Sequence, residues 1–345
     1  MSRVALSPGS AESETADDWS QIRLHIVTGK GGAGKTTVAT ALALTVASLG
    51  KRVLLAEVEG RQGIAQALDV PPLGTSEQRV VRVSGGGEVW GLAVEAKAAL
   101  IEYLSIFYHL GSAGGVLEKL GAIDFATTIA PGVRDVLCIG KVYEAVGRRG
   151  PSGAHAYDVV ILDAPPTGRI ASFLNVNEEV AELAKVGPIR NQADSITRML
   201  HARSCAVHIV TLLEEMPIQE SIEAVAELRR HGLPLGAVVV NQARDALVEA
   251  EAAGCLLTAQ VDLDAVAAQL SALGVIDSRD DGRSAAALLT QARGHVERLA
   301  LEDEQLAALD DLGLPVYVLP HILDPTGASS VRELAQELAG QAVWG

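Results

Sequence analysis

The glycine-rich segment GKGGAGKTT, at residues 29–37, constrains this chain more than any other feature. It fits the phosphate-binding pattern G-x-x-x-x-G-K-[ST], in which backbone N–H groups wrap a triphosphate so closely that a Cβ would block the approach. The apolar, β-branched run at 22–28 predicts a strand before the segment, and the alanine- and leucine-rich run at 38–49 predicts a helix after it. This order of strand, glycine-rich turn and helix predicts a nucleotide-binding loop.

The pattern assigns a role to each part of the loop. The helix N-terminus supplies unpaired N–H donors and a partial positive charge. Lys35 is expected to reach the β- and γ-phosphates, and the Thr36 hydroxyl is expected to ligate Mg²⁺. The predicted nucleotide-binding residues of the loop are Gly29, Gly31, Gly32, Ala33, Gly34, Lys35, Thr36 and Thr37.

Acidic residues follow two further apolar strands. The run at 53–56 leads into Glu57 and Glu59, which are two apart and therefore project to the same side of a strand end. Ligands of open α/β sheets bind at such carboxyl ends, although two acids there can also be solvated groups that close a strand. The run at 157–162 leads into Asp163, which is expected to hold the Mg²⁺ shell through water or through Thr36.

Composition excludes several classes of protein. The net charge is −15 and no cluster of Lys and Arg is present, which argues against binding to nucleic acid or to an anionic membrane surface. The sequence contains no run of about 18 apolar residues, so it predicts no transmembrane helix. Cys138, Cys205 and Cys255 lie far apart without a C-x-x-C, which is typical of a reduced cytoplasmic protein with no zinc. A metalloid site assembled from the three cysteines in space remains an alternative.

The domain organisation follows from the same patterns. Residues 1–20 are polar and acidic and are expected to form a disordered tail, although Trp19 could dock on the core. Residues 21–345 are expected to form a single α/β domain, a doubly wound, mostly parallel sheet of about seven strands with helices on both faces. Helical insertions are expected at about 97–147 and 245–312.

Two details lie outside the phosphate loop. Residues 80–94 predict two strands around a Gly-Gly-Gly turn.

Within the first helical insertion, Tyr103, Phe107 and Tyr108 would share one helix face. Such a face indicates core packing or, alternatively, a groove for a client.

The second lysine of the loop, Lys30, carries a resemblance to a known family. GKGGAGKTT resembles the deviant Walker A loop of the MinD/ParA/ArsA group of dimeric P-loop ATPases. In that group the extra lysine crosses the dimer interface and touches the phosphates of the partner's nucleotide. The resemblance implies that the nucleotide is ATP and that Lys30 has this role, with an ordinary solvated loop lysine as the alternative.

Other segments resemble the ArsA and tail-anchored-protein targeting ATPases within this group. DAPPTGR at 163–169 is similar to their switch II, D-T-A-P-T-G-H, with arginine in place of the histidine. Glu59 occupies the position of a family aspartate that orients the attacking water, and is one methylene longer. Asn241, in V-N-Q, and Pro320, in the closing L-P segment, match the family's contacts to the adenine base.

In overall layout the chain most resembles the paired bacterial anion-transporting-ATPase-like proteins, in which two related chains can form a heterodimer. This implies a Mg²⁺-dependent ATPase with Lys30, Lys35 and Glu59 as catalytic residues. It would work as a homodimer, or as a heterodimer with a related subunit, on an unidentified client or membrane pump. Two alternatives remain. One is a ParA/MinD-type positioning ATPase, which the acidic charge disfavours. The other is a non-hydrolysing regulatory module, which the intact loop disfavours.

Overall fold

The computed structural model describes residues 19–58, 60–108, 133–175, 188–258, 261–277, 282–323 and 327–341. Glu59, the segment 1–18 and most of the middle of the first helical insertion therefore lie outside the described residues. Helix α3 (Ala96–Tyr108) is described as backbone, but the predicted aromatic face of Tyr103, Phe107 and Tyr108 lies outside the described side chains.

The described residues form one eight-stranded sheet, in the order β3-β4-β2-β5-β1-β6-β7-β8. The strands are β1 (Leu24–Gly29), β2 (Arg52–Glu57), β3 (Gln78–Arg82), β4 (Glu88–Ala93), β5 (Val159–Asp163), β6 (Cys205–Thr211), β7 (Leu235–Ala243) and β8 (Val316–Pro320). All neighbours pair in parallel except β3 and β4, which form the hairpin predicted at 80–94. The predicted doubly wound α/β fold is confirmed, with eight strands where about seven were expected and with the hairpin as an antiparallel edge.

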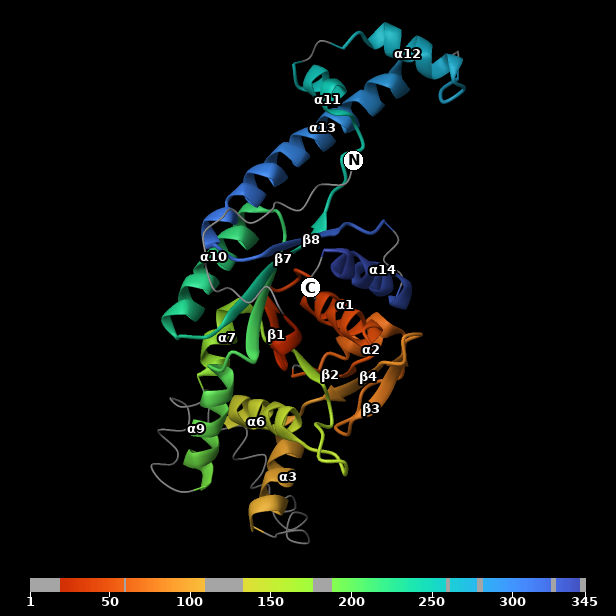
Figure 1. Ribbon diagram of the computed structural model, residues 1–345. Helices are drawn as coiled ribbons and strands as arrows, with labels where there is room; N and C mark the ends of the chain where they lie inside the picture. The colour runs from red at the N-terminus through yellow and green to blue at the C-terminus, as the bar shows by residue number, and fades with distance from the viewer. Residues whose placement is uncertain are drawn as a thin grey trace.

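Helices cover both faces of the sheet, as Figure 1 shows. Alternate residues of each central strand enter two hydrophobic clusters, so that Val160 and Leu162 pack on one side and Val159 and Ile161 on the other. Strands buried on both faces read as continuous apolar runs, which explains the strength of their sequence signal. One layer holds α1 (Lys35–Ser48), α2 (Gly63–Leu68) and α14 (Gly327–Gly340). The opposite layer holds α6 (Val133–Gly147), α7 (Thr167–Leu174), α9 (Pro188–Leu200) and α10 (Glu215–Arg230).

Trp19 belongs to this core rather than to a solvated tail. It lies in a short 3-10 helix, Trp19–Gln21, and is buried. Its ring centroid lies 4.5 Å from that of His208 and 5.4 Å from that of Tyr317. The described part of the chain therefore starts with a side chain that packs on β6 and β8.

A helical arm extends from the carboxyl half of the molecule. Figure 1 shows α13 (Arg283–Ala307) rising away from the sheet, with α11 (Ala250–Leu257) and α12 (Leu263–Ala272) beside its far end. None of the helices in the described part of the chain combines the length and the apolar composition needed to cross a bilayer.

Candidate functional site

The phosphate loop leaves the carboxyl end of β1 and leads directly into α1. Gly34 precedes the helix with φ of 88°, in the left-handed region that favours glycine. At Gly29 a Cβ would lie 2.1 Å from the carbonyl oxygen of Val210 on neighbouring β6. Glycine is thus required at both motif positions, by backbone conformation at one and by close packing at the other.

The hydroxyl of Thr36 and the carboxylate of Asp163 meet at the edge of the sheet. Thr36 Oγ1 donates a hydrogen bond to Asp163 Oδ2 at 2.5 Å. The two residues come together because β1 and β5 are parallel neighbours, with Val27 opposite Asp163. Hydroxyl and carboxylate oxygens are the ligands that Mg²⁺ prefers, so the pair fits a magnesium ion.

The two loop lysines take different positions. Lys35 Nζ lies 3.4 Å from the carbonyl oxygen of Lys30, within the loop itself. Lys30 Nζ forms an ion pair at 2.8 Å with Glu220 Oε1 on α10, and both side chains keep about a third of their surface exposed. This pairing could not be predicted from the sequence, since Glu220 lies on α10, in the opposite layer of helices.

Glu57, at the end of β2, turns into the loop that follows it. Its two carboxylate oxygens accept hydrogen bonds from the backbone N–H of Gln62 at 2.9 Å and of Ile64 at 3.2 Å. These bonds satisfy donors at the start of α2 and fix the loop in place. Because Glu57 is buried and occupied in this way, it is a structural residue of the loop. The role of Glu59 stays a prediction.

Asn241 lies beneath the phosphate loop. Its Nδ2 donates a hydrogen bond to the Ala33 carbonyl oxygen at 2.9 Å, and the side chain is buried. Pro320 ends β8, the strand beside β7, so both residues lie at the carboxyl ends of neighbouring strands. The structure therefore brings the predicted residues of the loop, Thr36, Asp163, Asn241 and Pro320 to one edge of the sheet. The contact of Asn241 and Pro320 with an adenine stays a prediction.

The cysteines do not share a site in the described part of the molecule. Cys138 lies on α6 and Cys205 on β6, and burial raises the pKa of each thiol to about 12. Cys255 is exposed on α11. The described residues bring no three His, Cys, Asp or Glu side chains together as metal ligands.

The sequence of this chain was compared with known protein families and proteins. A family model described as anion-transporting ATPase matches residues 22–205. The chain is 46% identical to ATPase BagA of Mycobacterium tuberculosis over 324 residues, which cover 94% of each protein. It is 23% identical to ATPase GET3 of Kluyveromyces lactis over 254 residues, 64% of this chain and 72% of that protein. It is also 23% identical to ATPase ARSA1 of Chlamydomonas reinhardtii over 288 residues, 69% of this chain and 36% of that protein.

Proposed function

Because the chain belongs to the family of anion-transporting ATPases, we propose that it hydrolyses ATP with Mg²⁺. The observation that carries the proposal is the 2.5 Å hydrogen bond between Thr36 Oγ1 and Asp163 Oδ2. It joins the hydroxyl of a complete phosphate loop to an acid at the end of a neighbouring strand. This is the pair of oxygens that a nucleotide-bound Mg²⁺ requires.

Each residue then has a defined task. The loop N–H groups and Lys35 bind the phosphates, and their positive charge stabilises the charge that develops during phosphoryl transfer. Thr36 and Asp163 would hold Mg²⁺, which supplies further charge neutralisation when bound. Glu59 orients the attacking water. Asp163 also begins the segment that continues into α7, so the state of the nucleotide can be transmitted to that segment.

We further propose that ATP drives the closure of a dimer, formed by two copies of the chain or by the chain and a related subunit. Lys30 supports this because its side chain is about one-third exposed and its ammonium is held by an ion pair with Glu220, so the ammonium can move to contact a facing nucleotide. The dimer would act on a client or membrane pump that remains to be identified.

The test is the variant Lys35→Ala, compared with Lys51→Ala as a control of equal charge change at an exposed position after α1. Lys35→Ala should abolish ATP turnover and sharply weaken nucleotide binding, whereas Lys51→Ala should match the wild type. Steady-state phosphate release and titration with a fluorescent ATP analogue measure the two effects. Unchanged turnover in Lys35→Ala would refute ATP hydrolysis at this loop.

A further inference from the structure

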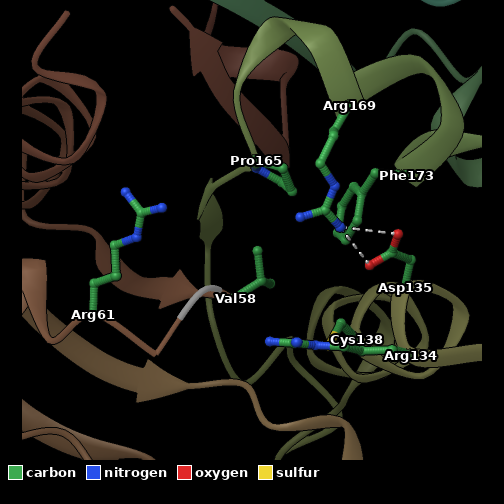
Figure 2. Close-up of a pocket in the computed structure, with 8 residues that line it drawn as sticks. All are labelled: Val58, Arg61, Arg134, Asp135, Cys138, Pro165, Arg169 and Phe173. Atoms are coloured by element: carbon green, nitrogen blue, oxygen red, sulfur yellow. Dashed lines mark hydrogen bonds and ion pairs between the residues drawn. The ribbon is translucent and has the colours of Figure 1, made fainter. Parts of the chain in front are cut away.

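A cavity of about 200 Å³ lies between the two segments that follow β2 and β5. Val58 and Arg61 reach it from the segment after β2, and Pro165 and Arg169 reach it from the segment after β5. Arg169 and Phe173 lie on α7, and Arg134, Asp135 and Cys138 line the cavity from α6. The residues drawn in Figure 2 are Val58, Arg61, Arg134, Asp135, Cys138, Pro165, Arg169 and Phe173.

The cavity concentrates positive charge in an acidic chain. The chain holds 28 Lys and Arg against 43 Asp and Glu, yet three arginines line this one space. Asp135 is the only acid among the described lining residues, so their formal charge is positive by two. Like charges repel, and three guanidinium groups around one cavity are better tolerated when an anion lies between them.

The arginines come from three separate segments. Figure 2 shows Arg134 and Arg169 reaching toward the space beside Val58 from different sides, with Arg61 across from them. Asp135 Oδ2 lies 3.3 Å from Arg169 Nη2 and holds that guanidinium at the edge of the cavity. Each guanidinium presents a planar fork of donors that matches two oxygens of a tetrahedral oxyanion.

The remaining wall of the cavity is largely apolar. Val58, Cys138 and Phe173 are buried and line the cavity with apolar or weakly polar surface. The arginines themselves are exposed, so an anion could enter from solvent and lie against this apolar wall. The volume is several times the roughly 30 Å³ that one water occupies, which is enough for a small polyatomic ion.

We propose that this cavity is a second anion site, separate from the phosphate loop, and that it binds a small tetrahedral oxyanion of the phosphate class. The anion would bridge Arg134 and Arg169, with Arg61 adding charge from the segment after β2. The anion would therefore contact both the segment after β2 and the segment after β5, which begin at the edge of the sheet where the phosphate loop lies. The site needs neither Mg²⁺ nor hydrolysis, so it can exist even if the proposed activity does not.

The experiment is equilibrium dialysis of nucleotide-free protein against radiolabelled inorganic phosphate at low ionic strength, where exposed arginines are least screened. The wild type should bind phosphate, and unlabelled sulfate should displace it. Arg134→Gln and Arg169→Gln should each weaken binding about tenfold or more. Arg298→Gln on α13, an exposed arginine with the same charge change, should leave it unchanged. Asp135→Asn should strengthen binding, because the anion no longer competes with that carboxylate for Arg169.

The variant Lys35→Ala distinguishes phosphate binding in this cavity from phosphate binding in the phosphate loop. This variant weakens any binding of phosphate in the loop and cannot hydrolyse ATP, but phosphate should still bind in the cavity with the affinity that this site has in the wild type. Loss of binding in Lys35→Ala, with retention in Arg134→Gln and Arg169→Gln, would place the ion in the phosphate loop and overturn the proposal. Weaker binding in Asp135→Asn would overturn the placement of the ion beside Arg169. Circular dichroism of each variant establishes that the changes in binding do not come from unfolding.

Discussion

The Lys30 ammonium lies 2.8 Å from the Glu220 carboxylate of the same chain, and both side chains remain about one-third exposed. Exposed ion pairs contribute about 0–1 kcal/mol, because water competes for both charges. The ion pair with Glu220 therefore positions the Lys30 side chain only weakly. A facing nucleotide, with several negative charges, would compete effectively for the same ammonium.

Lys30→Ala should leave ATP binding by the single subunit largely intact and lower turnover by about a thousandfold or more, as for other cations that stabilise phosphoryl transfer. Glu220→Gln is the matched control, and its turnover should stay within about fivefold of the wild type because the pair is weak. Single-turnover hydrolysis and nucleotide titration measure these effects. Adding a related subunit should raise wild-type turnover without fully rescuing Lys30→Ala. Equal turnover in Lys30→Ala and wild type would leave Lys30 as a loop lysine paired with Glu220.

Asp163→Asn should raise the Mg²⁺ concentration required for half-maximal hydrolysis by about 10- to 100-fold, because the neutral amide supports the Thr36 ligand less well than a carboxylate. Asp158→Asn removes the same charge just before the start of β5, at the opposite end of the strand that Asp163 ends, and should keep the wild-type requirement. A Mg²⁺ titration of phosphate release compares the two variants. Identical midpoints for Asp163→Asn and wild type would remove Asp163 from the metal site.

The pairing of Thr36 with Asp163 could be predicted because the phosphate loop that leads to Thr36 follows the apolar strand β1, and Asp163 ends the apolar strand β5. Parallel strands of one sheet bring their carboxyl ends to the same edge, so residues far apart in the chain are brought together by backbone geometry alone. The contacts of Lys30 with Glu220 and of Asn241 with Ala33 could not be predicted in this way. They depend on side-chain direction and on the distance between layers, which periodicity does not encode. The three arginines of the cavity come from separate segments, and their meeting depends on the same tertiary packing.

Removing residues 1–18 should leave the melting temperature unchanged, because that segment has few apolar residues to bury. Trp19→Ala in the full chain should destabilise the protein by about 3–5 kcal/mol, since a buried aromatic ring is lost and a cavity is left. Thermal unfolding followed by circular dichroism compares the two changes. A melting temperature for Trp19→Ala equal to that of the wild type would show that the ring contributes nothing to the core.

His25 and His208 form a buried pair whose ring nitrogens, Nδ1 and Nε2 respectively, lie 2.9 Å apart. Burial lowers the pKa of His208 to about 3 and also holds the pKa of His25 well below its usual value. Between pH 6.5 and about 3 the unfolded chain therefore binds more protons than the folded one. Stability that is complete above pH 6.5 should be lost as the pH falls, by up to about 1.4 kcal/mol per pH unit for each histidine.

The measurement is the free energy of unfolding by urea at several pH values from 7.5 to 5. His208→Gln should reduce the slope of stability against pH, whatever its effect on stability at neutral pH. His231→Gln, at an exposed position after α10, should preserve the wild-type slope. If His208→Gln and wild type lost stability in parallel on acidification, the pair would not be the source of the pH dependence.

A Cβ added at Gly34 would lie 2.2 Å from Asn241 Nδ2, the atom that donates to the Ala33 carbonyl. Any side chain at position 34 would therefore have to be accompanied by a smaller residue at position 241, which would give up the bond to the loop. The residues at positions 34 and 241 therefore constrain each other, although Gly34 lies in the phosphate loop before α1 and Asn241 lies on β7, far away in the chain. A side chain at position 34 with Asn241 kept would therefore force the loop or the amide to move, whereas a smaller residue at position 241 with Gly34 kept would cost only the hydrogen bond to Ala33.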